Sequence, residues 1–108
     1  MADFVCVARA GDLVDGQALS TFVGDERVAV FRIAGQFYAI EDRCTHDEGT
    51  LSEGSVDGEI IECPRHGAKF NIRTGEVLSM PAVVPVRTFP VRVVDGEVFV
   101  RVAGEGPC

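Results

Sequence analysis

Short apolar stretches recur along most of the chain, and none shows a sustained helical period. These stretches are rich in β-branched and aromatic residues, and Gly, Asp and Asn separate them. The predicted strands are Phe4–Ala8, Ala18–Phe22, Arg27–Ile33, Gln36–Ile40, Glu59–Glu62, Val86–Phe89, Val91–Val94 and Glu97–Val102. Eight short strands predict an all-β fold with an antiparallel sandwich or barrel as its base.

Two pairs of residues between these strands have the chemistry of tight turns. Ala34-Gly35 separates the third predicted strand from the fourth, and Asp95-Gly96 separates the last two. Each pair ends in glycine, which accepts the positive φ that two-residue turns require. Both joints therefore predict β-hairpins.

The last two predicted strands alternate in a way that assigns their faces. The valines that we expect to face the core are Val91, Val93, Val98, Val100 and Val102. Arg92 and Arg101 occupy intervening positions, so we expect both to face water. Cys6 lies in the first predicted strand and is expected to be a small buried apolar residue.

The middle of the chain, from about residue 42 to residue 85, differs from its strand-rich flanks. It has two loops rich in Cys, His, Gly and Pro around a short hairpin. A length of 108 residues suits one compact domain, so we predict a single domain over residues 1–108 with an inserted subdomain over about 42–85. Such an insertion places functional loops on a rigid scaffold.

Two clusters in this insertion each pair a cysteine with a histidine. One residue separates Cys44 from His46, two separate Cys63 from His66, and 16 separate His46 from Cys63. These two histidines are the only ones in the sequence. Thiolates and imidazoles on two facing turns can enclose a metal centre, so we predict that the four residues are metal ligands.

A structural zinc site is the competing interpretation of the same four residues. Zinc fingers usually group their cysteines in one pair and their histidines in another, whereas here each cluster mixes the two. Zinc would imply a different class of function, an interaction domain that is stabilised by the metal and has no redox role.

The order C-x-H followed by C-x₂-H resembles the Rieske family, in which histidines replace two cysteines on one iron of a [2Fe–2S] cluster. The resemblance extends over Cys44-Thr45-His46, Leu51-Ser52-Glu53-Gly54, Cys63-Pro64-Arg65-His66-Gly67-Ala68-Lys69-Phe70-Asn71 and Thr74-Gly75. It implies one [2Fe–2S] cluster per chain, with Cys44 and Cys63 on the inner iron and His46 and His66 on the outer iron. It also implies a small antiparallel base domain and a covering proline loop at Met80-Pro81-Ala82.

Two departures from the high-potential respiratory members of that family narrow the expected function. Those members carry an extra cysteine in each loop, and this chain has none at the corresponding places. They also read Gly-Ser-x-Tyr after the second histidine, where this chain has Gly67-Ala68-Lys69-Phe70 and lacks both hydroxyls that donate to the cluster sulfurs. The resemblance therefore implies a low-potential ferredoxin of the kind that serves bacterial aromatic-ring oxygenases.

Such a ferredoxin carries electrons and is not an enzyme in its own right. Its implied partners are a flavin-dependent NAD(P)H reductase, which supplies one electron, and a terminal ring-hydroxylating oxygenase, which accepts it. The small subunit of an assimilatory nitrite reductase is an alternative that the resemblance leaves open. We expect no catalytic residue, interpret Asp42, Asp47 and Glu48 as solvated loop charges, and assign no role to Cys108.

The charges argue against a nucleic-acid partner. The chain has 10 Lys+Arg and 17 Asp+Glu, a net charge of −7, which is opposite in sign to what a phosphate backbone requires. The start of the chain lacks the features of a signal peptide, and no apolar run approaches the ~20 residues of a membrane span. We expect a cytoplasmic monomer. We interpret the excess of acids in residues 1–54 as ordinary surface charge that keeps the protein soluble, with steering of a basic redox partner as the alternative.

Overall fold

The computed structural model describes residues 4–43, 50–64, 67–79 and 85–102. The first elements in these ranges are β1 (Val5–Arg9), η1 (Ala10–Asp12), β2 (Ala18–Val23), β3 (Glu26–Ile33) and β4 (Gln36–Glu41). The middle elements are η2 (Leu51–Glu53), β5 (Ser55–Asp57), β6 (Ile60–Glu62), β7 (Lys69–Asn71) and β8 (Val77–Ser79). The last are β9 (Thr88–Phe89), β10 (Val91–Val94) and β11 (Glu97–Val100). These elements confirm the all-β prediction.

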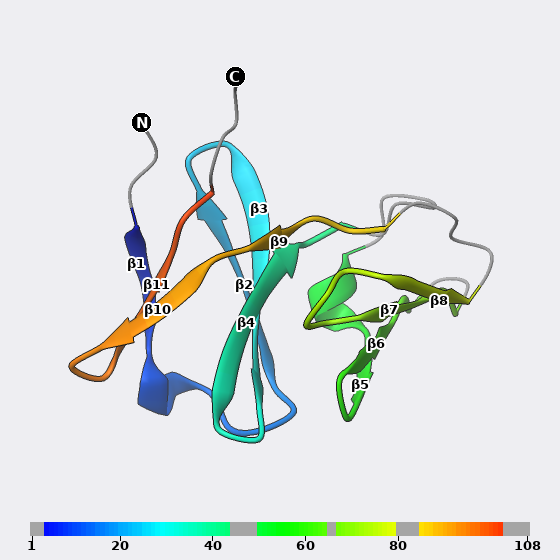
Figure 1. The fold of residues 1–108 in the computed structure, drawn as a ribbon, viewed down its shortest axis with the longest axis horizontal. Coiled ribbons are helices and arrows are strands. Elements are labelled where there is room, and N and C mark those ends of the chain that lie inside the picture. Colours follow the sequence, from blue (N-terminus) through cyan, green and yellow to red (C-terminus); the bar gives the residue numbers. More distant parts are fainter. Residues whose placement is uncertain (1–3, 44–49, 65–66, 80–84, 103–108) are drawn as a thin grey trace.

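The strands form three antiparallel sheets (Figure 1). Sheet A has the order β1-β11-β10, sheet B the order β2-β3-β4-β9, and sheet C the order β5-β6-β7-β8. Sheets A and B form the base, and sheet C lies beside them. The strands of sheet C come from the part of the chain between β4 and β9. No helix of the described residues is long and apolar enough to cross a membrane.

Sheet B is the middle layer, because its central strands bury residues on both faces. Val28, Ala29, Val30 and Phe31 of β3 are all fully buried, although neighbouring residues of a strand point to opposite faces. Val28 and Val30 join a core that includes Val98 of sheet A, whereas Ala29 and Phe31 join a second core with residues of sheet C. The second core therefore fixes sheet C against the base.

Sheet C is larger than the short hairpin predicted for the middle of the chain. Of its strands, only β6 coincides with a predicted strand, and β5, β7 and β8 were not predicted. Each of these has three residues, which is too short for the alternation of apolar and polar positions to be visible in the sequence.

The two predicted hairpins are confirmed, and their turns have the expected backbone geometry. Ala34 and Gly35 have φ values of 51° and 79°, and Asp95 and Gly96 have values of 52° and 77°. Positive φ at both central residues is the type I′ geometry, which matches the twist of the flanking strands. These turns set the registers of the pairs β3–β4 and β10–β11.

The predicted facing of the last two strands is correct for β11 and partly wrong for β10. Val98 and Val100 are fully buried, and Val102 packs against the same core. Val93 is instead 47% exposed, because β10 is an edge strand of sheet A and its end near the turn is open to solvent. Val91, at the start of β10, packs partly against the core.

The predicted burial of Cys6 is wrong, and Arg92 and Arg101 are not purely solvated. Cys6 is exposed beside a register shift in β1, which changes the alternation so that Ala8 packs against the core. The guanidinium carbons of Arg92 and Arg101 lie 4.4 and 5.1 Å from the centre of the Phe4 ring, so both cations stack on an aromatic face.

Candidate metal centre

The second predicted ligand cluster belongs to the loop of the β6–β7 hairpin. Glu62 of β6 pairs with Lys69 of β7, and Cys63 is the first residue after β6. The Cys63 N–H donates to the carbonyl of Ala68 at 2.7 Å, and the Gly67 N–H donates to the carbonyl of Cys63 at 3.2 Å. Gly67 has a φ of +79°, which an L side chain rarely adopts. These features close a tight turn that begins at Cys63.

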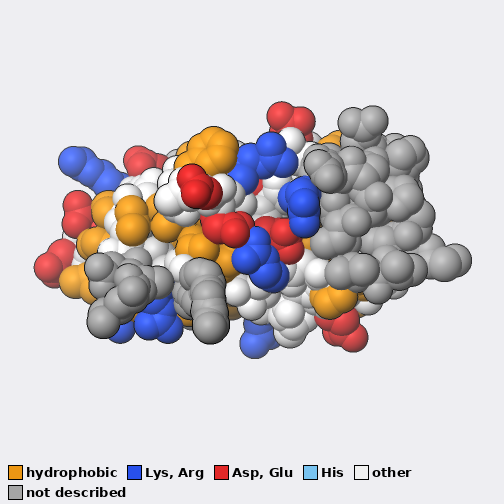
Figure 2. Space-filling view, turned by 90° about the horizontal axis from the view of Figure 1, so that it is seen from above, with side chains coloured by type: hydrophobic (Ala, Val, Ile, Leu, Met, Phe, Trp, Pro, Cys, Tyr) orange, Lys and Arg blue, Asp and Glu red, His pale blue; other side chains and the backbone are white. Residues whose placement is uncertain are grey.

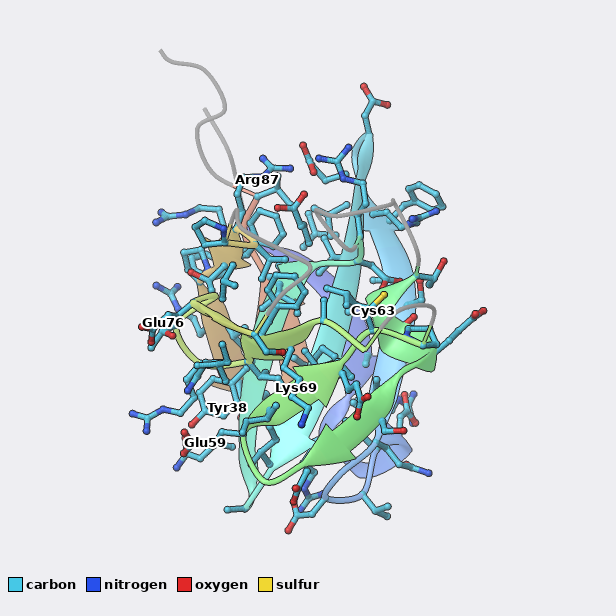
Figure 3. All side chains as sticks on the ribbon, turned by 90° about the vertical axis from the view of Figure 1, so that its right-hand side faces the viewer. Tyr38, Glu59, Cys63, Lys69, Glu76 and Arg87 are labelled. Carbon is cyan, nitrogen blue, oxygen red and sulfur yellow. The ribbon has the colours of Figure 1, made fainter. Side chains whose placement is uncertain are left out.

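Cys63 provides a buried, unpaired thiol at this turn. It is 1% exposed and lies in the second core with Leu51, Ala68 and Phe70. Figure 3 shows its sulfur above Lys69 and Glu59, toward the end of the molecule at which Arg87 lies. A thiol shielded from water on a constrained turn suits a thiolate ligand of an iron–sulfur cluster, so this residue fits the predicted centre.

The first predicted ligand cluster lies between two segments that Asp42 joins. Asp42 follows β4, and its Oδ1 accepts a hydrogen bond from the Ser52 N–H of η2 at 2.7 Å. Its Oδ2 accepts hydrogen bonds from the hydroxyls of Ser20 at 2.6 Å and Ser52 at 2.8 Å. Asp42 is fully buried, so its interpretation as a solvated loop charge is wrong. Its position directly after a buried strand was the available signal in the sequence.

The chain that returns from the predicted proline loop is fixed at two points. The Val86 N–H donates to the carbonyl of Gly75 at 3.0 Å, which ties this segment to the turn between β7 and β8. The Arg87 N–H donates to the carboxylate of Glu41 at 2.8 Å, and the Glu41 N–H donates to the Arg87 carbonyl at 2.9 Å. Val86 belongs to the second core, as do Leu51 and Cys63. Residues next to the two predicted ligand loops and the predicted proline loop therefore pack in one core.

Several residues to which the sequence assigned a role lie outside the described residues. They are the predicted ligands Cys44, His46 and His66, the predicted loop charges Asp47 and Glu48, and the predicted proline loop Met80-Pro81-Ala82. Of the four predicted ligands, Cys63 is thus the one that the described part of the chain includes, and the complete ligand set stays a prediction. Cys108 lies outside the described residues as well.

The surface around Arg43 and Arg87 combines positively and negatively charged side chains with an exposed aromatic ring. A shallow hollow there is lined by Phe22, Glu26, Arg27, Glu41, Arg43 and Arg87. Arg87 pairs with Glu26, and Arg43 Nη2 lies 3.6 Å from Glu41 Oε2. Figure 2 shows Lys and Arg beside Asp and Glu in the middle of this face. Phe22 is 66% exposed, which gives this surface an apolar group that a partner protein can contact.

Comparison with known sequences identifies relatives over most of the chain. The profile of the Rieske [2Fe–2S] domain matches residues 3–90. Ferredoxin CarAc of Metapseudomonas resinovorans is 53% identical over 83 residues, which cover 77% of this chain and 76% of that protein. The ferredoxin component of biphenyl 2,3-dioxygenase from Rhodococcus jostii (strain RHA1) is 39% identical over 98 residues, which cover 91% of this chain and 92% of the relative.

Solved structures show the same fold. A chain in the complex of reduced oxygenase and oxidized ferredoxin in carbazole 1,9a-dioxygenase matches with a TM-score of 0.85 and 46% identity, over 89% of this chain and 99% of that one. A putative NADH-dependent nitrite reductase small subunit from Mycobacterium tuberculosis matches with a TM-score of 0.86 at 21% identity, over 96% of this chain and 98% of that one, and shares the fold alone. Since the profile covers residues 3–90 and Cys63 occupies a suitable buried turn, the chain belongs to the Rieske [2Fe–2S] domain family and holds one [2Fe–2S] cluster.

Proposed function

We propose that this chain is the ferredoxin component of a ring-hydroxylating oxygenase system. It accepts one electron from a flavin-dependent NAD(P)H reductase and passes it to a terminal oxygenase. The observation that carries the proposal is the 39% identity to a biphenyl dioxygenase ferredoxin over 92% of that protein's length. The proposal treats the chain as a carrier and assigns it no catalytic residue.

The proposed ligands are Cys44, His46, Cys63 and His66. The bound [2Fe–2S] cluster supplies a centre that takes up and releases a single electron. Two features of the described residues support this ligand set: Cys63 is a buried thiol on a closed turn, and Asp42 joins the two segments that flank residues 44–49. The proposal also places the chain in the cytoplasm, where thiols stay reduced and available to iron.

The charged surface around Phe22 supports a role in transient contacts with partner proteins. The exposed Arg43 and Arg87 are paired with glutamates within the chain, and they can exchange these partners during docking. Surfaces that combine arginine with an exposed aromatic ring resemble the centres of protein interfaces in composition. This surface lies beside the segments that flank the predicted ligands, as an electron carrier requires.

A reconstituted system tests the proposal. The purified chain, a flavin-dependent reductase and a terminal oxygenase of the biphenyl or carbazole class are combined with NADH and the aromatic substrate. We expect hydroxylated product only when the chain is present, and we expect a Cys63→Ser variant to support far less. A different result would favour the nitrite reductase alternative. In that case the reductase would reduce the chain, the chain would pass no electrons to these oxygenases, and it would increase the activity of a nitrite reductase large subunit.

A further inference from the structure

Two consecutive carboxylates are the buried charged residues of the described part of the chain. Glu41 is 6% exposed and Asp42 is fully buried, and both stand at the end of β4 just before the first ligand cluster. Neighbouring residues of an extended chain point in opposite directions, so the two side chains reach different segments. Glu41 contacts Arg87, and Asp42 contacts Ser20 and Ser52. The end of β4 is thus a junction for segments that are distant in sequence.

Asp42 makes five hydrogen bonds at this junction, through both its side chain and its backbone. The carboxylate accepts three, from the Ser20 hydroxyl, the Ser52 hydroxyl and the Ser52 N–H, at 2.6, 2.8 and 2.7 Å. The Asp42 N–H donates to the Arg27 carbonyl at 2.8 Å, and its own carbonyl accepts from Arg27 Nε at 3.0 Å. The residue therefore has almost no freedom to move relative to β2 and β3.

The same contacts constrain both ends of the segment that contains Cys44 and His46. Cys44 follows Asp42 by two residues, and Ser52 follows His46 by six. The Ser52 bonds reach across this segment, because they join the chain just before it to η2 just after it. Leu51, the neighbour of Ser52, is fully buried and holds η2 in the second core. A loop whose two ends are held at a fixed separation samples far fewer conformations than a free one.

We infer that Asp42 is a positioning residue of the iron–sulfur centre, whose hydrogen bonds to Ser52 set the placement of the loop that carries Cys44 and His46. This inference rests on the proposed ligand set. Groups that orient metal ligands without touching the metal commonly control how tightly the metal is held and which geometry it adopts. Asp42 performs this role through the backbone at both ends of the loop.

The choice of a carboxylate follows from the three donors that face it. A buried carboxylate accepts from all of them at once, whereas alanine leaves the two hydroxyls and the Ser52 N–H without this acceptor. Asparagine keeps the shape of the side chain. Its oxygen can accept from the Ser52 N–H, and its amide can donate to hydroxyls that rotate to accept. Asp42→Asn should therefore preserve the junction that Asp42→Ala removes.

The test compares the holoprotein with four variants: Asp42→Ala, Asp42→Asn, Ser52→Ala and Val98→Ala. Electron paramagnetic resonance of the reduced protein reports the geometry of the ligands, and the rate of iron release to a chelator reports how firmly the cluster is held. We expect Asp42→Ala to alter the spectrum and to release iron about tenfold faster, in line with the effect of losing a group that orients metal ligands. Ser52→Ala should show a smaller change, because the Ser52 N–H still donates to Asp42.

Asp42→Asn and Val98→Ala separate positioning from general stability. Asp42→Asn should keep the wild-type spectrum and release rate. Val98 is fully buried in the other core, so Val98→Ala should lower the unfolding temperature and leave the spectrum unchanged. A folded Asp42→Ala with the wild-type spectrum and release rate would overturn the inference. If Asp42→Ala does not fold, a wild-type spectrum and release rate in Ser52→Ala would overturn it instead. Absence of an iron–sulfur signal in the wild type would contradict the proposed function itself.

Discussion

Gly54 lies so close to β6 that a residue with a side chain would not fit at this position. A Cβ atom added there would lie 2.0 Å from the carbonyl oxygen of Glu62, 3.1 Å from its carbonyl carbon and 3.2 Å from Ile61 Cδ1. Its φ of −81° is ordinary, so the requirement for glycine comes from this contact and not from backbone strain. The obstructing atom belongs to the backbone, which cannot rotate away as a side chain could.

Gly54→Ala therefore requires a displacement of the peptide that joins Glu62 to Cys63. Real Cβ contacts are essentially never shorter than 3.0 Å, so the two atoms must separate by at least 1.0 Å (3.0 minus 2.0). The same peptide supplies the N–H that bonds to Ala68 at 2.7 Å. Overpacking costs about 1–3 kcal/mol and a lost hydrogen bond about 1 kcal/mol, so we expect a loss of about 2–4 kcal/mol in the free energy of unfolding.

Thermal unfolding followed by circular dichroism measures this loss. At about 4 °C per kcal/mol for a domain of this size, Gly54→Ala should lower the unfolding temperature by about 8–16 °C. Gly11→Ala is the matched control, because no atom lies within 4 Å of a Cβ built at Gly11. Iron content should also fall in Gly54→Ala, since the displaced peptide contains Cys63. If the two variants unfolded at the same temperature with full iron content, the close approach of Gly54 to β6 would have no structural importance.

Three further predictions concern the turn after β7, the potential and the partners. Gly75→Ala should lower the free energy of unfolding by about 2–4 kcal/mol, because its Cβ would lie 2.2 Å from the Val86 carbonyl oxygen. Gly58→Ala should lower it by only about 1–2 kcal/mol, because Gly58 has a φ of +62° but no atom lies within 4 Å of an added Cβ. Chemical denaturation measures both values. Ala68→Ser with Phe70→Tyr should raise the reduction potential in voltammetry, since both positions are fully buried and their new hydroxyls can donate to cluster sulfurs; an unchanged potential would refute this. Electron transfer to the oxygenase should slow between ~0.1 M and ~1 M salt, as the Debye length falls from ~10 to ~3 Å; a rate independent of salt would exclude steering by acidic residues.

The sequence predicted the elements whose pattern is local. The apolar run of β3 and the two hairpin turns are visible from a few neighbouring residues, and the structure places them as expected. The family resemblance likewise rests on motifs of a few residues, and the profile match confirms it. The extra strands of sheet C escaped prediction because each has only three residues and owes its existence to pairing with a neighbour.

The role of Asp42 could not be predicted, because it depends on contacts between distant residues. Ser20 precedes Asp42 by 22 positions and Ser52 follows it by 10. Only the packing of η2 against β2 and β3 brings these groups together. Ser52 belongs to a motif of the family resemblance, but nothing in that motif indicates a contact with Asp42. Cys6 and Val93 were misplaced for a related reason: edge strands and register shifts are properties of the sheet as a whole.

The central claim is that the chain holds one [2Fe–2S] cluster on two cysteines and two histidines. Quantification of iron, acid-labile sulfide and zinc in the purified protein tests it most directly, with the His66→Ala variant measured alongside. We expect about two irons and two sulfides per chain with little zinc, and clear loss of iron in the variant, because each iron needs four ligands. About one zinc per chain without sulfide would contradict the claim and establish the zinc-stabilised alternative.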